Sequence, residues 1–270
     1  MIRTLCSIAL AALLASCAAH PTVAESPRVS DSIVRSLAPT GKLRASVNLG
    51  NPVLAYRDAK GEPAGVSVDL SRELARRLGV PLELVIYEAA GKVVEGGKRG
   101  EWDVGYVAID PARATEIEFS PPYVVIEGAY LVREGSPIRT NVQVDVKGTH
   151  IAVGKDSAYD LYLTRNIRDA QLVRAESSPQ VVDFFLAGNL DVAAGVKQQL
   201  EADAKRVPGL RILDGRFMVI NQAIGIPLGR AEGKRYVAAF IEEMKAGGFV
   251  LRSLQRHNIQ GAAVAPAAGP

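Results

Sequence analysis

Short apolar runs alternate with amphipathic segments along most of the chain. Residues 43–49 and 82–87 are short apolar runs of the kind that forms buried strands. Between them, leucines recur every four residues from position 70 to position 78, which predicts a helix with Asp69 as its N-terminal cap. This part of the chain therefore predicts a β-α-β unit.

The same alternation continues to position 256. It predicts further strands at 102–108, 151–153, 172–174 and 190–194, and further helices at 92–99, 157–163, 179–187, 198–205, 234–245 and 249–256. Strands that alternate with helices favour a largely parallel sheet with helices on both faces. We expect an α/β fold with two such units.

The two ends of the chain differ from this pattern. Arg3 precedes the apolar run 5–15, which is too short for a membrane span of about 20 residues and predicts a secretory signal over residues 1–16. The segment Leu14-Ala15-Ser16-Cys17 resembles a lipobox, so Cys17 is a candidate for lipidation; ordinary cleavage near Ala19 or Ala24 is the alternative. We expect residues 17–40 to be a tether with a short helical turn, and residues 260–270 to be a disordered tail.

Composition excludes several classes of function. The net charge of +3 is small and spread along the chain, so it gives no argument for nucleic-acid binding. Cys6 and Cys17 are the only cysteines and both lie in or beside the signal segment, so we expect no disulfide and no thiol nucleophile in the folded body. His20, His150 and His257 are isolated and are expected to be solvated or capping. No metal and no cofactor are expected.

Several motifs give the chain a resemblance to a known family. They are Asp58-Ala59-Lys60-Gly61, Glu101-Trp102-Asp103-Val104-Gly105, Asp110-Pro111-Ala112-Arg113 and Phe119-Ser120-Pro121-Pro122-Tyr123. From Gly41 to about Gly261 the chain resembles the amino-acid-type periplasmic solute-binding proteins (solute-binding protein family 3), which feed ABC importers.

The resemblance implies a type II periplasmic binding protein fold, in which two Rossmann-like lobes enclose a ligand cleft and are joined by a two-strand hinge. Lobe 1 would be discontinuous, over residues 41–129 plus 222–259, and lobe 2 would be residues 130–221. The chain would cross between the lobes near 127–132 and near 218–226. We expect a monomer in the periplasm with a membrane permease as its partner.

Arg113 is the strongest candidate for a binding residue. Ligands of open α/β sheets lie beyond the carboxyl ends of the strands, and Arg113 follows the strand expected at 102–108. In the family that the chain resembles, the arginine of a Thr-Pro-x-Arg motif holds the ligand carboxylate, which a planar guanidinium does with two parallel hydrogen bonds. The alternative is a surface arginine, or one paired with Glu116 or Glu118.

Three positions depart from the family pattern. Asp110 replaces the threonine, and it is expected either to pair with Arg113 or to bind a cationic group of the ligand. Leu54 lies where an aromatic side chain often stacks on the ligand, and Val196 lies where lobe 2 usually supplies an aspartate for the ligand ammonium. Valine cannot neutralise an ammonium, and a buried unpaired charge is costly.

Glu127 is the candidate that would replace the missing aspartate. It lies in an apolar run expected to form the first hinge crossing, where a carboxylate needs a partner. Either it is a counter-charge for the ligand near Arg113 and Ser157, or it makes a structural ion pair or hydrogen bond. The remaining candidates lie in loops or at a helix start whose N–H groups attract anions: Asn48, Ala108, Ser157 and Ala158.

The resemblance implies a solute-binding protein rather than an enzyme. Two alternatives stay open: a periplasmic enzyme like cyclohexadienyl dehydratase, with Asp110 or Glu127 as its acid, and a sensor subunit for a separate receptor. No nucleophile triad is visible in the sequence.

Overall fold

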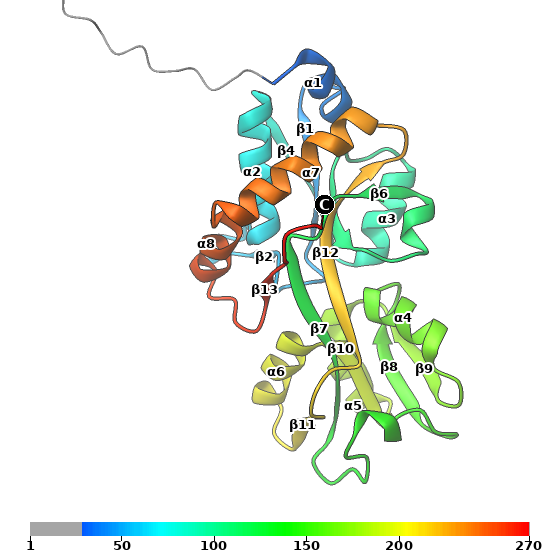
Figure 1. The fold of residues 1–270 in the computed structure, drawn as a ribbon. Helices are drawn as coiled ribbons and strands as arrows, with labels where there is room; N and C mark the ends of the chain where they lie inside the picture. The colour runs from blue at the N-terminus through cyan, green and yellow to red at the C-terminus, as the bar shows by residue number, and fades with distance from the viewer. Residues whose placement is uncertain (1–28, 270) are drawn as a thin grey trace, which may run out of the picture.

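The computed structural model describes residues 29–269, which form two α/β lobes joined by two long strands (Figure 1). The signal segment and Cys17 lie outside the described residues. Within the described part, no helix is both long enough and apolar enough to cross a bilayer.

Lobe 1 is built on two parallel strands, β1 (Leu43–Asn48) and β4 (Leu82–Tyr87), so that Asn48 lies opposite Tyr87 at their carboxyl ends. A parallel bridge between Ala45 and Val104 attaches the start of β5 (Gly105–Ala108) to β1. The other elements of the lobe are α1 (Asp31–Leu37), β2 (Tyr56–Arg57), β3 (Pro63–Ala64), α2 (Val66–Leu78), α3 (Ala90–Lys98), η1 (Arg113–Thr115), β6 (Ile117–Phe119), α7 (Ala231–Ala246) and α8 (Phe249–Arg256).

Lobe 2 contains a parallel set of strands, in which β8 (His150–Gly154) lies between β9 (Gln171–Ala175) and β10 (Val192–Val196). The strands β8 and β10 are fully or almost fully buried, as expected for strands covered by helices on both faces. The other elements of the lobe are η2 (Asn141–Gln143), α4 (Ala158–Asn166), η3 (Ser178–Gln180), α5 (Val181–Ala187), α6 (Lys197–Arg206) and β11 (Leu210–Ile212).

Two antiparallel strands, β7 (Val124–Arg133) and β12 (Met218–Pro227), run from one lobe into the other (Figure 1). They join β5 and β6 of lobe 1 to the strands of lobe 2 in one nine-stranded sheet, whose central path is β5-β12-β7-β10-β8-β9, while β1 and β4 form a separate two-stranded sheet. The expected crossings near 127–132 and 218–226 fall within these two strands. Two-strand connections of this kind are typical of hinges, about which two lobes can rotate.

Both ends of the described chain differ from the expected tether and tail. Helix α1 packs on α7 and buries Leu37 completely, so the last part of the expected tether belongs to lobe 1. The expected disordered tail contains β13 (Ala263–Val264), which pairs with β7, and Ala265 is buried. A strand with a free edge can order such a segment through backbone hydrogen bonds, which do not depend on side-chain pattern.

Asp69 and His257 also differ from their expected roles. Helix α2 begins at Val66, before Asp69, and its N-cap makes no side-chain hydrogen bond. The Asp69 carboxylate instead accepts hydrogen bonds from Ser253 (2.6 Å) and Arg256 (3.0 Å), and lies 2.9 Å from Nε2 of His257. This buried network holds α8 against α2.

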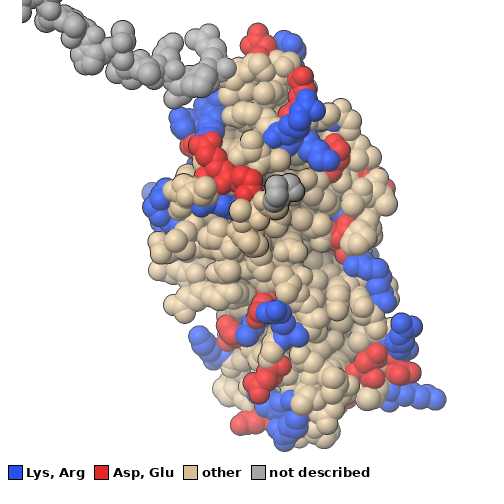
Figure 2. Space-filling model, viewed as in Figure 1, with Lys and Arg blue, Asp and Glu red and all other residues tan. Residues whose placement is uncertain are grey.

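Charged side chains of both signs are interspersed on the face of the molecule shown in Figure 2. This face carries no large field of one sign, as the small net charge predicts.

Candidate functional site

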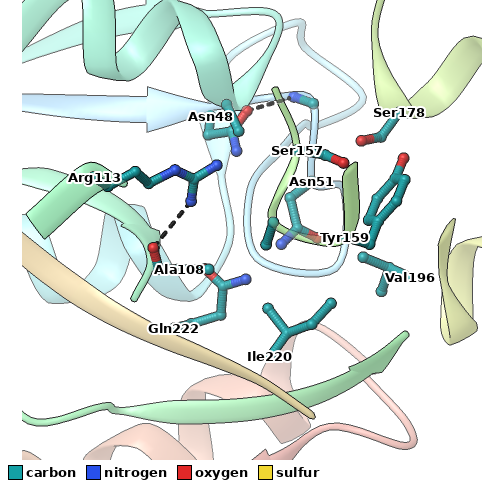
Figure 3. A pocket seen from close by; sticks show the side chains of 13 residues that line it. Asn48, Asn51, Ala108, Arg113, Ser157, Tyr159, Ser178, Val196, Ile220 and Gln222 are labelled. Atoms are coloured by element: carbon teal, nitrogen blue, oxygen red, sulfur yellow. Dashed lines mark hydrogen bonds between the residues drawn. The ribbon is translucent and has the colours of Figure 1, made fainter. Parts of the chain in front are cut away.

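A narrow cavity lies between the lobes, beside the hinge strand β12. It is lined by 13 residues (Figure 3): Asn48, Gly50, Asn51, Ala90, Ala108 and Arg113 from lobe 1, Ser157, Ala158, Tyr159, Ser178 and Val196 from lobe 2, and Ile220 and Gln222 from β12. The centre of a water-sized sphere can occupy about 30 Å³ of it, which is room for very few waters. The two lobes therefore lie close together around this space in the structure.

The position of the cavity follows from the strand order. Asn48 ends β1 and Ala108 ends β5, so both lie at the carboxyl edge of the lobe 1 sheet. Val196 ends β10 on the opposite side of the cavity. Polar groups in the loops after these strands meet at this edge, which is where open α/β sheets bind ligands.

Arg113 extends into the cavity from the turn that follows β5 (Figure 3). Asp110 forms this turn by accepting a hydrogen bond from the backbone N–H of Ala112 at 2.8 Å. The guanidinium donates to the backbone oxygens of Ala108 and Asp156, both at 2.9 Å. Because Asp156 belongs to lobe 2, this side chain bridges the two lobes.

The Arg113 guanidinium is buried without an acidic partner. It is 3% exposed, and among residues 29–269 no carboxylate lies within ion-pair distance of it. Burial lowers the pKa of Arg113 to about 10, against the opposing effects of Asp110 and Asp156, so it is a cation at neutral pH. Neither Glu116 nor Glu118 is its partner; they pair with Lys98 and Lys234.

Asp110 does not line the cavity, and it neither pairs with Arg113 nor faces a solute. Its carboxylate binds Arg165 of α4 at 2.6 and 3.3 Å, so it forms an ion pair between the lobes. The sequence did not point to this partner, because Arg165 is 55 residues away along the chain and only the fold brings α4 to this loop.

The start of α4 forms the lobe 2 wall of the cavity. Ser157 caps this helix, and its hydroxyl accepts a hydrogen bond from the N–H of Asp160 at 3.0 Å. The N–H groups of Ala158 and Tyr159 have no hydrogen-bond partner in the described part of the chain. A helix N-terminus with free N–H groups favours an anion, so this wall complements Arg113 across the cavity.

Neutral amides complete the lining. Asn51 is 8% exposed, and its Oδ1 is buried with no hydrogen-bond partner among the described residues. Asn48 accepts a hydrogen bond from the N–H of Gly50 at 3.0 Å through its Oδ1, which leaves its Nδ2 as a donor (Figure 3). Gln222 lies on β12, two residues after Ile220 and therefore on the same face of the strand.

Seven lining residues were not among the predicted site residues: Gly50, Asn51, Ala90, Tyr159, Ser178, Ile220 and Gln222. The sequence carried a signal for three of them. Asn51 lies in the loop at the carboxyl end of the first strand, and the two-residue spacing of Ile220 and Gln222 would have shown them once β12 was treated as a hinge strand. Tyr159 and Ser178 depend on how α4 and η3 meet in space.

Glu127 and Leu54 lie outside the lining. Glu127 binds Arg216 at 2.6 Å and Lys197 at 3.4 Å, and the hydrogen bond from Arg216 lowers the pKa of its carboxyl. This placement corrects the expectation that its carboxylate faces Arg113 and Ser157, because tertiary neighbours from α6 and the loop before β12 neutralise it. Leu54 is buried in the core of lobe 1.

No cluster of three or more His, Cys, Asp or Glu side chains suited to a metal ion occurs within residues 29–269.

Comparison with known proteins gives the family. The model of the bacterial extracellular solute-binding proteins, family 3, matches residues 43–258. The L-cystine-binding protein TcyJ of Escherichia coli K12 is 22% identical over 220 residues, covering 81% of this chain and 83% of that protein.

Solved structures share the fold. The L-cysteine solute receptor of Neisseria gonorrhoeae has a TM-score of 0.74 at 24% identity, over 84% of this chain and 94% of that chain. An ancestral amino acid-binding protein, described as a precursor of cyclohexadienyl dehydratase, has a TM-score of 0.71 at 19% identity, over 83% of this chain and 98% of that chain.

Proposed function

We propose a function from the premise that this chain belongs to the bacterial extracellular solute-binding proteins of family 3: it captures a small, amino-acid-sized solute that carries a carboxylate, and delivers it to an ABC importer. The solute is enclosed between the lobes, in the cavity around Arg113.

One observation carries the proposal, which is the buried guanidinium of Arg113 without an acidic partner. A guanidinium has five N–H donors, and Arg113 uses only two of them, on the backbone oxygens of Ala108 and Asp156. A buried cation left in this state is unfavourable, and a carboxylate would relieve it with two parallel hydrogen bonds. The free N–H groups at the start of α4 support the same ligand group from the opposite wall.

The surroundings of the acidic residues favour binding over catalysis. A dehydratase needs an acid or base within reach of its substrate. The two candidate acids, Asp110 and Glu127, are held in ion pairs with Arg165, and with Arg216 and Lys197. The cavity lining within the described chain contains no carboxylate.

The remaining parts of the proposal concern the cell. We infer that the protein works as a monomer in the periplasm. A similar protein, the lysine/arginine/ornithine-binding periplasmic protein of Escherichia coli K12, is periplasmic by name. Its partner would be the permease of an ABC importer in the inner membrane. Cys17, if lipidated, would attach the protein to the membrane.

Titration calorimetry with a co-purified ligand tests the proposal. Native mass spectrometry of protein purified without denaturation identifies the ligand, and calorimetry then compares wild type with Arg113→Ala and with Arg216→Ala. Arg216 is the control because it is an arginine that already has a carboxylate partner, Glu127, and does not line the cavity. We expect a carboxylate ligand whose binding depends on Arg113 and not on Arg216.

A ligand without a carboxylate, or equal affinities for wild type and Arg113→Ala, would contradict the proposal. Incubation of the protein with prephenate or arogenate checks the enzymatic alternative, and formation of product would replace the proposed function with a dehydratase activity.

A further inference from the structure

The cavity carries one formal charge, which is the cation of Arg113. The other polar side chains of its lining are neutral: Asn48, Asn51, Ser157, Tyr159, Ser178 and Gln222. Burial raises the pKa of Tyr159 to about 12, so its hydroxyl also stays neutral at pH 7. A solute enclosed here meets one positive charge and no negative one.

The acids around the cavity are occupied elsewhere. Besides Asp110 and Glu127, Asp160 at the start of α4 binds Arg174 and accepts a hydrogen bond from the N–H of Asp156. The side chain of Asp156 packs over Gly91 and lines a neighbouring groove on the other side of Arg113, not the cavity. Among the described residues, no Asp or Glu side chain lines the cavity, so the lining supplies no counter-charge for an ammonium.

Charge balance then separates two kinds of carboxylate ligand. A zwitterionic α-amino acid would neutralise Arg113 with its carboxylate but would bring a second cation into a closed cavity without a counter-charge. A monoanion whose other polar groups are neutral would leave the cavity with no net charge.

Asn51 indicates what the neutral group would be. Its Oδ1 is a buried acceptor without a donor, so it favours a ligand group with an N–H or an O–H. A hydroxyl or an amide satisfies this acceptor without adding charge.

Val196 is the position at which one acid would change this balance. It lines the cavity, and it is also the N-cap of α6, where its side chain makes no capping hydrogen bond. Aspartate and asparagine are both favourable at an N-cap, so either fits the helix start better than valine does. Only aspartate would also supply the missing negative charge.

We propose that this cavity selects small organic monoanions, in which a carboxylate is accompanied by a neutral hydrogen-bond donor such as a hydroxyl or an amide, over zwitterionic α-amino acids. The inference rests on the proposed function, since it assumes that Arg113 holds the carboxylate. It adds the class of solute that the rest of the lining accepts.

Matched pairs of ligands test the inference on the wild-type protein. Each pair shares one carbon skeleton and differs in the α-substituent: L-lactate and L-alanine, 2-hydroxy-4-methylpentanoate and leucine, phenyllactate and phenylalanine. By calorimetry at pH 7 we expect the hydroxy acid to bind at least about tenfold more tightly than the amino acid in every pair that binds. Lactamide, which lacks the carboxylate, should not bind.

The variants Val196→Asp and Val196→Asn separate charge from shape. Val196→Asp should reverse the preference within a pair by about tenfold or more, because the new carboxylate attracts the ammonium and opposes the hydroxy acid. Val196→Asn, which has the same shape and no charge, should keep the wild-type preference. Since both residues suit the N-cap, both variants are expected to fold.

The outcomes distinguish the inference from the proposed function. Tighter binding of amino acids to wild type, lost in Arg113→Ala, would overturn the inference and leave the proposed function intact. Equal preferences in Val196→Asp and Val196→Asn would overturn the charge argument. Binding of no carboxylate, in the pairs or as a co-purified ligand, would overturn the proposed function and the inference with it.

Discussion

Two buried charges in lobe 1 have opposite surroundings. Asp103 is 0% exposed and lies between two cations: the Arg44 guanidinium donates hydrogen bonds to it at 2.9 and 3.0 Å, and the Arg230 guanidinium donates one at 3.1 Å. Arg113 is almost as buried, at 3% exposed, but its partners are two backbone carbonyls.

The difference shows how to tell a structural charge from a binding charge. The carboxylate of Asp103 has its counter-charges within the chain and ties the first strand, through Arg44, to the start of α7, through Arg230. The guanidinium of Arg113 has none, so the chain leaves its neutralisation to something that it binds.

Among the substitutions that test this difference, Asp103→Asn should have the largest effect, which is a loss of folding stability. The substitution leaves Arg44 and Arg230 without a counter-charge, and we expect a loss of about 3 kcal/mol in the free energy of unfolding. Equilibrium urea unfolding followed by the fluorescence of the single tryptophan, Trp102, measures it. Glu118→Gln, which breaks a partly exposed pair with Lys234, is the control and should cost less than about 1 kcal/mol. Equal losses in the two variants would contradict the comparison.

Arg113→Ala should instead weaken ligand binding and leave folding stability nearly unchanged. Carboxylate binding should weaken by about 1.5–3 kcal/mol, the range for a hydrogen bond to a charged group. The free energy of unfolding of the ligand-free protein should change little, because loss of the bonds to Ala108 and Asp156 is offset by removal of an uncompensated buried cation. Calorimetry and urea unfolding on the same samples test both parts. A stability loss as large as that of Asp103→Asn, with binding unchanged, would show that Arg113 is structural.

Arg165→Ala should have a smaller effect on ligand binding, because it removes only an ion pair that holds the two lobes together. Arg165 reaches from lobe 2 to Asp110 in lobe 1 and is 41% exposed on its side chain, so removing the pair should weaken binding by about 0.5–1 kcal/mol. Because the pair exists only when the lobes are closed, the change should lie in the rate of ligand release, measured by stopped-flow fluorescence. Arg206→Ala removes pairs within lobe 2 and should leave this rate unchanged. A faster release in both variants would contradict an interlobe role.

Glu73→Gln should have the smallest effect, a change in folding stability that is measurable only at acidic pH. Hydrogen bonds, first from Arg76 and then from Arg77, lower the pKa of its carboxyl from 4.5 to about 2. A carboxyl whose pKa is lowered in the folded state stabilises the fold above its unfolded value and loses this contribution as the pH falls. Stability should therefore decline between pH 4.5 and pH 2, and less steeply in Glu73→Gln. Thermal unfolding across this range measures it, and parallel curves for the two proteins would contradict the assignment.

Local structure was largely predictable. The strand expected at 82–87 is β4 (Leu82–Tyr87), and the strand expected at 43–49 ends one residue earlier, at Asn48. The helix expected at 249–256 is α8 (Phe249–Arg256). Apolar periodicity and capping residues act within a few positions along the chain, so these elements can be read from the order of residues alone.

The ends of the chain were predicted less well. Residues 263–264 have no apolar pattern, yet they form a strand because the edge of β7 offers unpaired backbone groups. Leu37 ends a segment with weak periodicity, and it is buried because α7 supplies the other half of the contact. In both cases the ordering partner is more than one hundred residues away along the chain.

The order of residues was enough to predict the α/β alternation, a helix start near Ser157 and the position of Arg113 beyond a strand end. Which charges are neutralised depends on tertiary contacts, which pair Asp110 with Arg165 and Glu127 with Arg216 and leave Arg113 without an acid. The physical reason is range: helix and strand propensities depend on neighbours in sequence, whereas the state of a buried charge depends on whatever the fold brings within a few ångströms of it.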